Sequence, residues 1–249
     1  MKVLLINGSS HKEGNAFHAL SMAAKTLETQ GIETEIVQLG NKPVRGCIAC
    51  GGCKKKNNSR CAFDDDVCNG FLAKAEHADG FIFGSPVYFG QPNGTLLAVV
   101  QRMLVAGGSL MKNKPVANVA VCRRGGATAA YQTMNMAFEM MNMPIVTSQY
   151  WNIVYGLKPG EADLDEEGMQ TMRTMANNMA WLLKRIHQGG DPQYPERSVD
   201  TDEFHQDLQV IVTSIKKDCQ RWQSFFYASI FHAHRGSMEK EMLKQINRS

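Results

Sequence analysis

Two groups of residues in this sequence are of types that carry chemistry, and the first is a short polar loop. It runs from Gly8 to Asn15 as GSSHKEGN, between an apolar run, Val3 to Ile6, and a helical pattern over Ala16–Gln30. The first N–H groups of a helix have no partner within the helix, and the helix dipole favours negative charge there. We therefore expect an anion site, and specifically a phosphate. The alternative is an ordinary loop whose Ser and Asn only cap the helix.

The same loop excludes two common kinds of nucleotide site. It does not read G-x-x-x-x-G-K-[ST], so it is not the P-loop of a nucleoside triphosphatase. It does not read G-x-G-x-x-G either, so the dinucleotide-binding fingerprint is missing.

The second group is a run of four cysteines, Cys47-x₂-Cys50-x₂-Cys53-x₇-Cys61. Three cysteines at two-residue gaps can direct their thiolates into one small volume, and a fourth can arrive from later in the loop. Zinc usually takes two separated C-x₂-C pairs, so this spacing favours a [4Fe–4S] cluster. Reduced thiols without a metal, a redox dithiol and a zinc site remain the alternatives.

A loop rich in glycine, proline and aromatic residues follows a later apolar run. The run is Gly80–Gly84, and the loop is Ser85–Gly94, SPVYFGQPNG. In an open α/β sheet, ligands bind beyond the carboxyl ends of the strands, where the order of the chain reverses. We expect this loop to face Gly8–Asn15 there and to bind the polar edge of a flat heterocycle, with Tyr88 or Phe89 near its ring. Alternatively, the two aromatic side chains only cover the end of the sheet.

The elements that must position these loops alternate between strand and helix. Their pattern predicts an α/β fold with a doubly wound, five-stranded parallel sheet in the order 2-1-3-4-5. The acidic triplet Asp64–Asp66 is expected to cap a helix rather than to bind metal. We expect strands at Val3–Ile6, Glu33–Leu39, Gly80–Gly84, Pro115–Cys122 and Pro144–Thr147, and helices at Ala16–Gln30, Asp65–Glu76, Gly94–Ala106, Ala129–Met143 and Asp163–His187.

The chain of 249 residues is long enough for this sheet domain and an appendage. We place the sheet domain at residues 1–188, with a cysteine-rich loop at 43–63, and a linker with a helical extension at 189–249. In the extension, apolar residues from Phe204 to Phe226 recur every three or four positions. Such a stripe must be buried against the core or a second subunit.

Composition limits the class of protein. A net charge of +3 is too small to indicate a nucleic-acid partner, and no apolar run approaches the roughly 20 residues of a membrane span. The N-terminus leads directly into a strand, without a signal peptide, so we expect a cytoplasmic protein. Seven cysteines in such a compartment argue against a disulfide scaffold. We interpret Cys68, Cys122 and Cys219 as structural.

Three segments resemble the NADPH-dependent FMN reductase branch of the flavodoxin-like superfamily: GSSHKEGN, SPVYFGQPNG and RRGGA at residues 123–127. The resemblance covers about residues 1–187, and the tail has no match. Ser10 stands where Pro is commoner, and Ala16 where Thr is commoner, which leaves Ala16 only its backbone N–H. The resemblance implies that the FMN phosphate is held by Ser9, His11, Asn15 and Ala16, the isoalloxazine by Pro86, Val87, Tyr88, Phe89 and Gly90, and its other side by Arg123, Arg124, Gly125 and Gly126.

The cysteine run is similar to that of iron–sulfur flavoproteins of the same fold. The implied function is an FMN-dependent oxidoreductase that takes hydride from NAD(P)H and reduces a quinone, an azo or nitro compound, or a metal ion. The flavin carries this chemistry, so no catalytic side chain is expected. The resemblance also implies a homo-oligomer, a dimer or tetramer, with its active site near the interface. The alternatives are an electron carrier without enzymatic activity and a metal-stapled module without flavin.

Overall fold

The structure, a computed structural model, describes residues 1–188. The predicted linker and helical extension, with the Phe204–Phe226 stripe and Cys219, lie outside the described residues, and the division of the chain at residue 188 stays a prediction. The elements in chain order are β1 (Lys2–Asn7), α1 (Asn15–Thr29), β2 (Glu33–Gln38), α2 (Gly52–Lys56), α3 (Cys68–Ala75), β3 (Gly80–Tyr88), β4 (Gln91–Pro92), α4 (Gly94–Met111), β5 (Val116–Cys122), α5 (Ala127–Glu139), β6 (Ile153–Tyr155), the 3-10 helix η1 (Glu161–Leu164) and α6 (Glu166–Ile186).

The sheet has five parallel strands in the order β2-β1-β3-β5-β6, and the short β4 pairs antiparallel with β3. Counted over the parallel strands alone, this is the predicted order 2-1-3-4-5. The chain reverses its direction of winding between β1 and β3, which pair directly; Leu5, for example, lies opposite Ile82. The fold class is therefore the doubly wound α/β fold that the sequence predicts.

The fifth parallel strand was predicted at the wrong residues. It is β6, which pairs with Ala120–Cys122 of β5, whereas the predicted segment Pro144–Thr147 makes only an isolated bridge between Ile145 and Val116. The chain leaves the sheet after this bridge and returns at the buried Asn152, whose side chain donates to the Val146 carbonyl. Pairing with the carboxyl end of β5, which is remote in sequence, decides which apolar segment becomes the strand.

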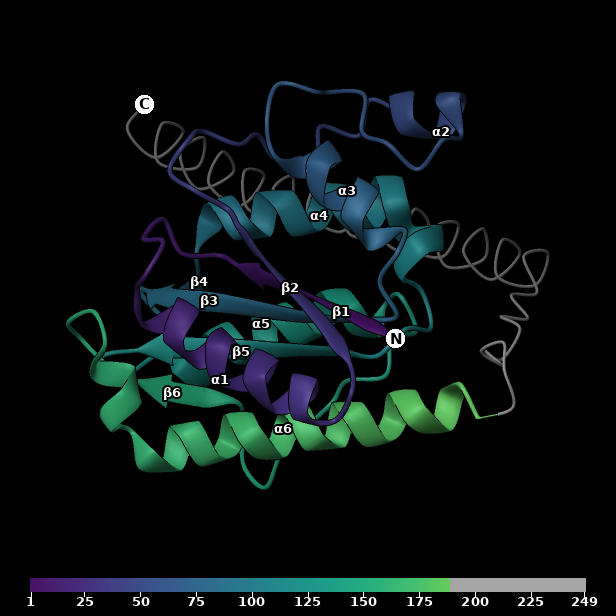
Figure 1. Cartoon of the computed structure of the whole chain (residues 1–249). Coiled ribbons are helices and arrows are strands. Elements are labelled where there is room, and N and C mark those ends of the chain that lie inside the picture. Colours follow the sequence, from purple (N-terminus) through teal and green to yellow (C-terminus); the bar gives the residue numbers. More distant parts are fainter. Residues whose placement is uncertain (189–249) are drawn as a thin grey trace, which may run out of the picture. The chain divides into compact units, whose positions relative to one another are not determined.

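Helices cover both faces of the sheet (Figure 1). Side chains of β1 alternate between the faces, as strand geometry requires. Val3 and Leu5 pack in the core on the side of α1 and α6, and Leu4 and Ile6 pack in the core formed with α3, α4 and α5. Both cores are apolar and β1 is buried on both faces, which explains its continuous run of apolar residues.

Helix α4 is longer than predicted, and it is the one helix in the described part whose length and composition would suit a membrane span. The sequence expectation that no apolar run approaches this length therefore does not hold for α4. Its side chains Leu96, Val99 and Met103 are fully buried in the core with α3 and the sheet. The packing of α4 against the sheet and α3 accounts for its apolar composition.

The acidic triplet does not supply the N-cap of α3 as predicted, because the N-cap is Val67 and makes no side-chain cap bond; one member, Asp66, bonds to the first turn. Asp66 accepts a hydrogen bond of 3.0 Å from the backbone N–H of Cys68, the first residue of α3. The helix therefore begins three residues later than predicted, at Cys68. Asp64 and Asp65 instead form ion pairs with exposed arginines. The predicted burial of Cys68 and Cys122 is confirmed.

We predict that Gly8→Ala destabilises the fold. A Cβ at Gly8 would lie 2.4 Å from Leu96 Cδ2 and 2.7 Å from the Gly84 carbonyl oxygen, and backbone cannot move aside as a side chain can. The free energy of unfolding, measured in urea, should fall by about 1–3 kcal/mol. The control is Gly70→Ala on α3, where a Cβ meets nothing within 4 Å; it should stabilise by about 0.5–1 kcal/mol. Equal effects of the two changes would contradict the prediction.

Candidate functional site

A cavity of about 390 Å³ opens at the carboxyl ends of the central strands. It brings together the loop after β1 and the carboxyl ends of β3 and β5, and adds the loop after β6. Its wall is made by Ser9, His11, Gly14, Asn15, Ala16, Pro86, Val87, Tyr88, Val121, Cys122, Arg123, Gly156, Leu157 and Pro159.

Neutral amide side chains hold the loop after β1 in shape. The Oδ1 of Asn7 accepts a hydrogen bond from the backbone N–H of Ser9, and its Nδ2 donates to Gln38 Oε1. Gln38 in turn donates through Nε2 to the Ser9 carbonyl at 2.6 Å. The Ser9 hydroxyl oxygen accepts from the backbone N–H of His11 at 3.0 Å. The ends of β1 and β2 therefore fix this loop before any ligand arrives.

The start of α1 offers N–H groups to an anion in the cavity. Its N-cap, Gly14, provides no side-chain hydrogen bond, and the first turn contains no acidic residue. In the described part of the chain, no hydrogen bond uses the backbone N–H of Asn15 or Ala16. Unsatisfied N–H groups at the positive end of a helix suit a phosphate. The geometry therefore fits the predicted anion site.

The loop after β6 is a part of the site that sequence reasoning missed. Glu161 holds it, because its carboxylate accepts from the N–H groups of Leu157 and Lys158 at 2.8 and 2.9 Å. The two backbone donors, Lys158 first, lower the pKa of Glu161. The sequence pattern that could have identified this loop is YGLKPG, a run of turn-forming residues after the apolar pair Ile153-Val154.

Asn15 joins this loop to α1. Its Oδ1 accepts a hydrogen bond of 3.1 Å from the backbone N–H of Ala162. A Cβ at Gly156 would lie 2.7 Å from Asn15 Nδ2 and 2.8 Å from the Ala162 nitrogen, so only glycine leaves room for this bond. The amide of Asn15 therefore fixes one wall of the cavity.

The turn between β3 and β4 is a tight hairpin. Its two central residues, Phe89 and Gly90, have φ values of 51° and 77°, and the phenylalanine side chain is fully exposed. A positive φ is uncommon for a bulky residue and favours glycine. Gly126 lies against this turn, since a Cβ on it would be 2.8 Å from the Gly90 Cα. The loops after β3 and β5 thus meet through two glycines.

Eight of the thirteen residues predicted to bind the cofactor line the cavity: Ser9, His11, Asn15, Ala16, Pro86, Val87, Tyr88 and Arg123. The other five do not: Phe89, Gly90, Arg124, Gly125 and Gly126. Burial raises the pKa of the Cys122 thiol in the wall, although backbone N–H groups oppose this, so the thiol stays protonated near neutral pH. Among the described residues, no hydrogen bond joins Cys122 to a basic side chain.

A second cavity, of about 210 Å³, contains all four residues of the cysteine run. Cys47, Cys50, Cys53 and Cys61 are free thiols, and no carboxylate or imidazole lines the cavity with them. Within residues 1–188, no three His, Cys, Asp or Glu side chains gather closely enough for one metal ion. A cluster takes one thiolate per iron and so accepts donors spread around a larger body. Four thiols without carboxylate or imidazole are the donor type that an iron–sulfur cluster takes.

Arg102 of α4 forms the inner wall of this second cavity. The side chain is 1% exposed, and its guanidinium donates to four groups. Nε donates to Cys61 Sγ at 3.3 Å, Nη1 pairs with the Asp66 carboxylate and contacts the Arg45 carbonyl, and Nη2 donates to the Phe63 carbonyl. Burial alone would lower the pKa of Arg102, but the bonds to Asp66 and Cys61 raise it overall. No feature considered at the sequence level had indicated this residue.

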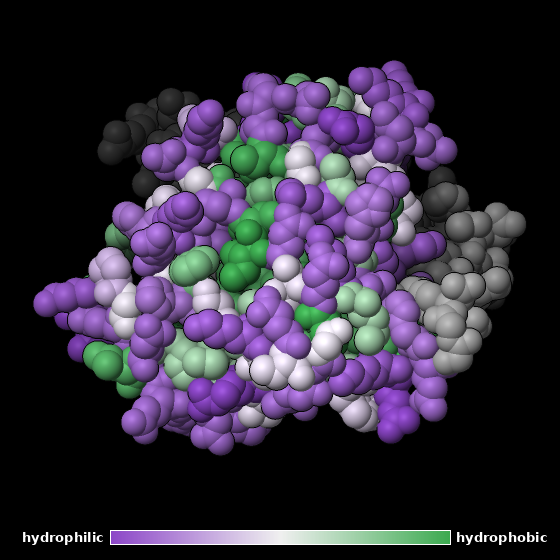
Figure 2. Space-filling model, viewed as in Figure 1, coloured by the Kyte–Doolittle hydropathy of each residue, from purple (hydrophilic) through white to green (hydrophobic). Residues whose placement is uncertain are grey.

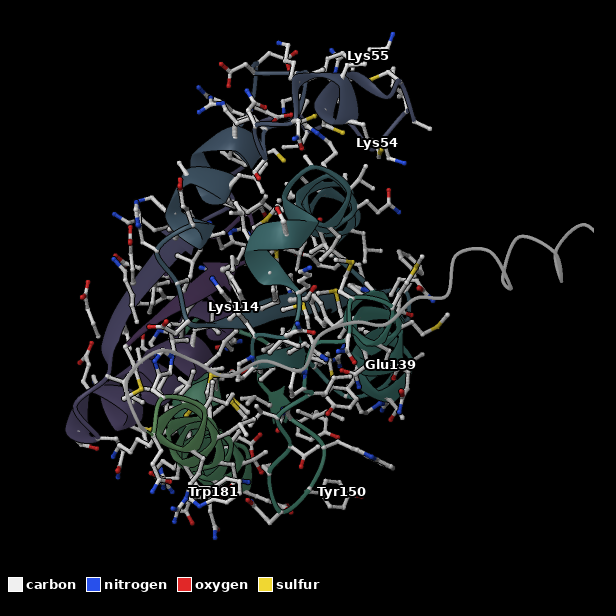
Figure 3. The ribbon with its side chains drawn as sticks, turned by 90° about the vertical axis from the view of Figure 1, so that its right-hand side faces the viewer. Lys54, Lys55, Lys114, Glu139, Tyr150 and Trp181 are labelled. Carbon is white, nitrogen blue, oxygen red and sulfur yellow. The ribbon has the colours of Figure 1, made fainter. Side chains whose placement is uncertain are left out.

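The outer side of the cysteine loop is hydrophilic. Lys54 and Lys55 lie on α2, at the end of the molecule farthest from Tyr150 and Trp181 (Figure 3). The surface around this end is mostly polar, while apolar side chains gather nearer the middle of the same face (Figure 2). The lysines are exposed, so solvation accounts for them without a further role.

Comparison with known proteins identifies the family. The sequence model of NADPH-dependent FMN reductases matches residues 1–158, from β1 through the loop after β6. The chain belongs to this family. An iron–sulfur flavoprotein of Methanocaldococcus jannaschii is 34% identical over 194 residues, which are 75% of this chain and 99% of that protein.

A second relative matches a longer part of this chain than the family model does. This iron–sulfur flavoprotein of Archaeoglobus fulgidus is 30% identical over 235 residues, and the match covers 90% of this chain and 98% of that protein. That share exceeds residues 1–188, so part of the C-terminal region has a counterpart in this relative. A flavodoxin from the domain Archaea superposes with a TM-score of 0.50 at 12% identity, covering 74% of this chain and 99% of that one. The fold is flavodoxin-like, and the protein is an FMN-dependent oxidoreductase of this family.

We predict that Gly156→Ala weakens FMN binding. The added Cβ would separate Asn15 from Ala162 and displace the wall that Asn15 fixes. The dissociation constant for FMN, titrated by flavin fluorescence on the apoprotein, should rise about tenfold, as expected for the loss of about 1.4 kcal/mol. The control is Gly94→Ala at the first residue of α4, where a Cβ meets nothing within 4 Å. An unchanged affinity in Gly156→Ala would contradict this role of Asn15.

Proposed function

We propose that this protein is an FMN-dependent NAD(P)H oxidoreductase that passes electrons to a small acceptor through a [4Fe–4S] cluster. The acceptor would be a quinone, an azo or nitro compound, or a metal ion. The observation that carries the proposal is the cavity at the strand ends, where the free N–H groups at the start of α1 share a wall with the ends of β3 and β5. Membership of the FMN reductase family and similarity to iron–sulfur flavoproteins support it.

One part of the cavity would hold the FMN phosphate. The N–H groups of Asn15 and Ala16 are free of other hydrogen bonds in the described chain, and the buried Ser9 hydroxyl lies beside them in the wall. Ser9 Oγ accepts from the His11 N–H, which leaves its own O–H to donate. His11, the fourth residue that the resemblance assigns to the phosphate, lines the same cavity. Backbone N–H groups at a helix start and a hydroxyl are groups that bind phosphate in proteins.

The other part would hold the flavin ring. FMN, when bound, supplies hydride and electron transfer at this ring. The chain provides the surfaces: Pro86 and Val87 at the end of β3, the buried Cys122 at the end of β5, and Leu157 opposite. Tyr88 and Leu157 are about half exposed at 48% and 58%, so they border the open side, where a nicotinamide would approach. These residues bind and orient the ring and exclude water from its inner side.

We also propose that the protein is a cytoplasmic homo-oligomer. Large aromatic side chains are exposed on the described part, among them Tyr150 and Trp181 (Figure 3). Trp151, next to Tyr150, is exposed as well. Tyr150 and Trp151 pack on each other with ring centroids 5.0 Å apart, which leaves their outer faces for a partner. Light scattering of the purified protein tests this, and a monomeric mass would contradict it.

Turnover distinguishes an enzyme from a carrier. Protein purified without oxygen should contain FMN, iron and sulfide, and it should oxidise NADH or NADPH in steady state with a small quinone as acceptor. A bound flavin that no reduced nicotinamide reduces would contradict the enzyme and support an electron carrier instead. Protein without flavin bands would contradict both.

The cluster ligands can be tested independently of the flavin. Cys50→Ser should remove most iron and sulfide and leave the FMN content unchanged, because the two cavities share no residue. The matched control is Cys68→Ala: this cysteine is fully buried outside the cavity, and burial raises its pKa to about 12, which keeps it a thiol. The control should keep its cluster. Full iron and sulfide in Cys50→Ser would exclude this cysteine as a ligand.

A further inference from the structure

Arg102 lies where the cysteine loop meets the sheet domain. It is the largest fully buried side chain of the described residues and the one charged residue of α4. A buried cation is costly unless it is paired and hydrogen-bonded. All its partners belong to residues 45–66, the segment that carries or borders the cysteine run.

We propose that Arg102 is a positioning residue for the cluster, which donates a hydrogen bond from Nε–H to the Cys61 sulfur and thereby raises the reduction potential of the cluster. The inference rests on the cluster of the proposed function and assigns to this residue a specific effect on it. Hydrogen bonds to the ligand sulfurs are one of the levers by which a protein sets the potential of an iron–sulfur centre.

The shape of the guanidinium fixes the direction of this bond. Nη1 is held by the Asp66 carboxylate and Nη2 by the Phe63 carbonyl. Because the guanidinium is planar and rigid, these two contacts determine where the Nε–H points. It points at Cys61 Sγ, 3.3 Å away. A lysine carries the same charge but has no rigid fork with which to reproduce the three contacts together.

The hydrogen bond to Cys61 acts on the potential of the cluster in one direction. Reduction of the cluster adds one electron, forms and breaks no bond, and makes the cluster with its thiolates more negative. A cationic donor at a ligand sulfur therefore stabilises the reduced state more than the oxidised state. Solvent screens this effect little, because Arg102 is 1% and the Asp66 side chain 4% exposed. In the proposed function, the electron comes from flavin reduced by NAD(P)H and leaves to the acceptor.

The four thiols differ in this respect. Cys53 Sγ makes only a long contact of 4.0 Å with the Val105 carbonyl, and Cys47 and Cys50 are exposed. Among the four, only Cys61 receives a hydrogen bond from a charged group in the described structure. The proposed effect of Arg102 therefore reaches the cluster through one ligand, Cys61.

The test compares two arginines of the same region. Arg102→Lys keeps the charge and removes the Nε–H donor. The control is Arg45→Gln. The Arg45 guanidinium pairs with Asp65 and stacks on Phe63, with its Cζ 4.5 Å from the ring centroid. In the described structure it makes no hydrogen bond to a sulfur, so the variant removes a charge but no Cys61 contact. The backbone carbonyl of Arg45 that Arg102 uses is retained in this variant.

The measurement is an anaerobic redox titration of the loaded proteins, followed by electron paramagnetic resonance. In Arg102→Lys, the equilibrium constant for reduction of the cluster should fall about tenfold, which is about 59 mV for a one-electron couple. The potential of the flavin should not change, and Arg45→Gln should leave both potentials unchanged. An unchanged cluster potential in a fully loaded Arg102→Lys protein, or equal shifts in the two variants, would overturn the proposal.

A second measurement uses the wild-type protein and does not depend on the folding of a variant. Protein grown with ¹⁵N-arginine is reduced and studied by pulsed electron paramagnetic resonance. A ¹⁵N coupling to the cluster spin is expected, because the Nε–H···S bond carries spin density to the arginine nitrogen. Its absence would overturn the proposal. Wild-type protein without iron and sulfide would instead overturn the proposed cluster, and this inference with it.

Discussion

One buried cation fastens the cysteine loop to the rest of the protein. Most side chains of residues 43–63 are exposed, so the loop has little hydrophobic core of its own. Arg102 compensates with contacts to the loop at Arg45, Cys61 and Phe63, and to Asp66, which also accepts from the first N–H of α3. Removing one partner of such a buried pair leaves an uncompensated charge and costs about 3–5 kcal/mol. The order of the loop and the start of α3 therefore depend on the same ion pair.

The flavin cavity is built in the opposite way, from neutral amides and backbone. Asn7 and Gln38 hold the loop after β1, and Asn15 holds the loop after β6. Asn93, the N-cap of α4, binds the loop after β1, because its Nδ2 donates to the Gly8 carbonyl at 2.8 Å. Neutral partners leave the positive end of α1 uncompensated by protein carboxylates. The site can therefore bind an anion without first losing an internal ion pair, and its loops are already ordered.

The sequence predicted those strands and loops whose formation leaves a pattern within a few neighbouring residues. Apolar runs placed β1, β3 and β5, and turn chemistry identified the loops after them, because burial on both faces leaves a direct mark on composition. The position of β6 could not be predicted this way, since Pro144–Thr147 and Ile153–Tyr155 are both apolar and only pairing with β5 distinguishes them.

The residues that were missed depend on contacts between distant segments. Position 156 must be glycine because the side chain of Asn15, which is remote in sequence, lies where a Cβ would be. No pattern within YGLKPG shows this contact. Arg102 left a weak signal, a single charge in an apolar helical stretch, which implies a buried partner but does not name it. Asp66 and Cys61 become its partners only when α4 packs beside the cysteine loop.

Helix α4 anchors a loop of each cavity, although the two cavities share no residue. Its N-cap, Asn93, accepts from the Thr95 N–H and binds the loop after β1, and Arg102 follows nine residues later, about 14 Å along the helix. The regular geometry of α4 is interrupted only at Gly107, where a Cβ would lie 2.3 Å from Leu72 of α3. Both anchors thus belong to the unbroken part of the helix. A change in the length or direction of that segment would move the cysteine loop relative to the flavin cavity, so the spacing of the two sites is a property of α4 rather than of the loops that form them.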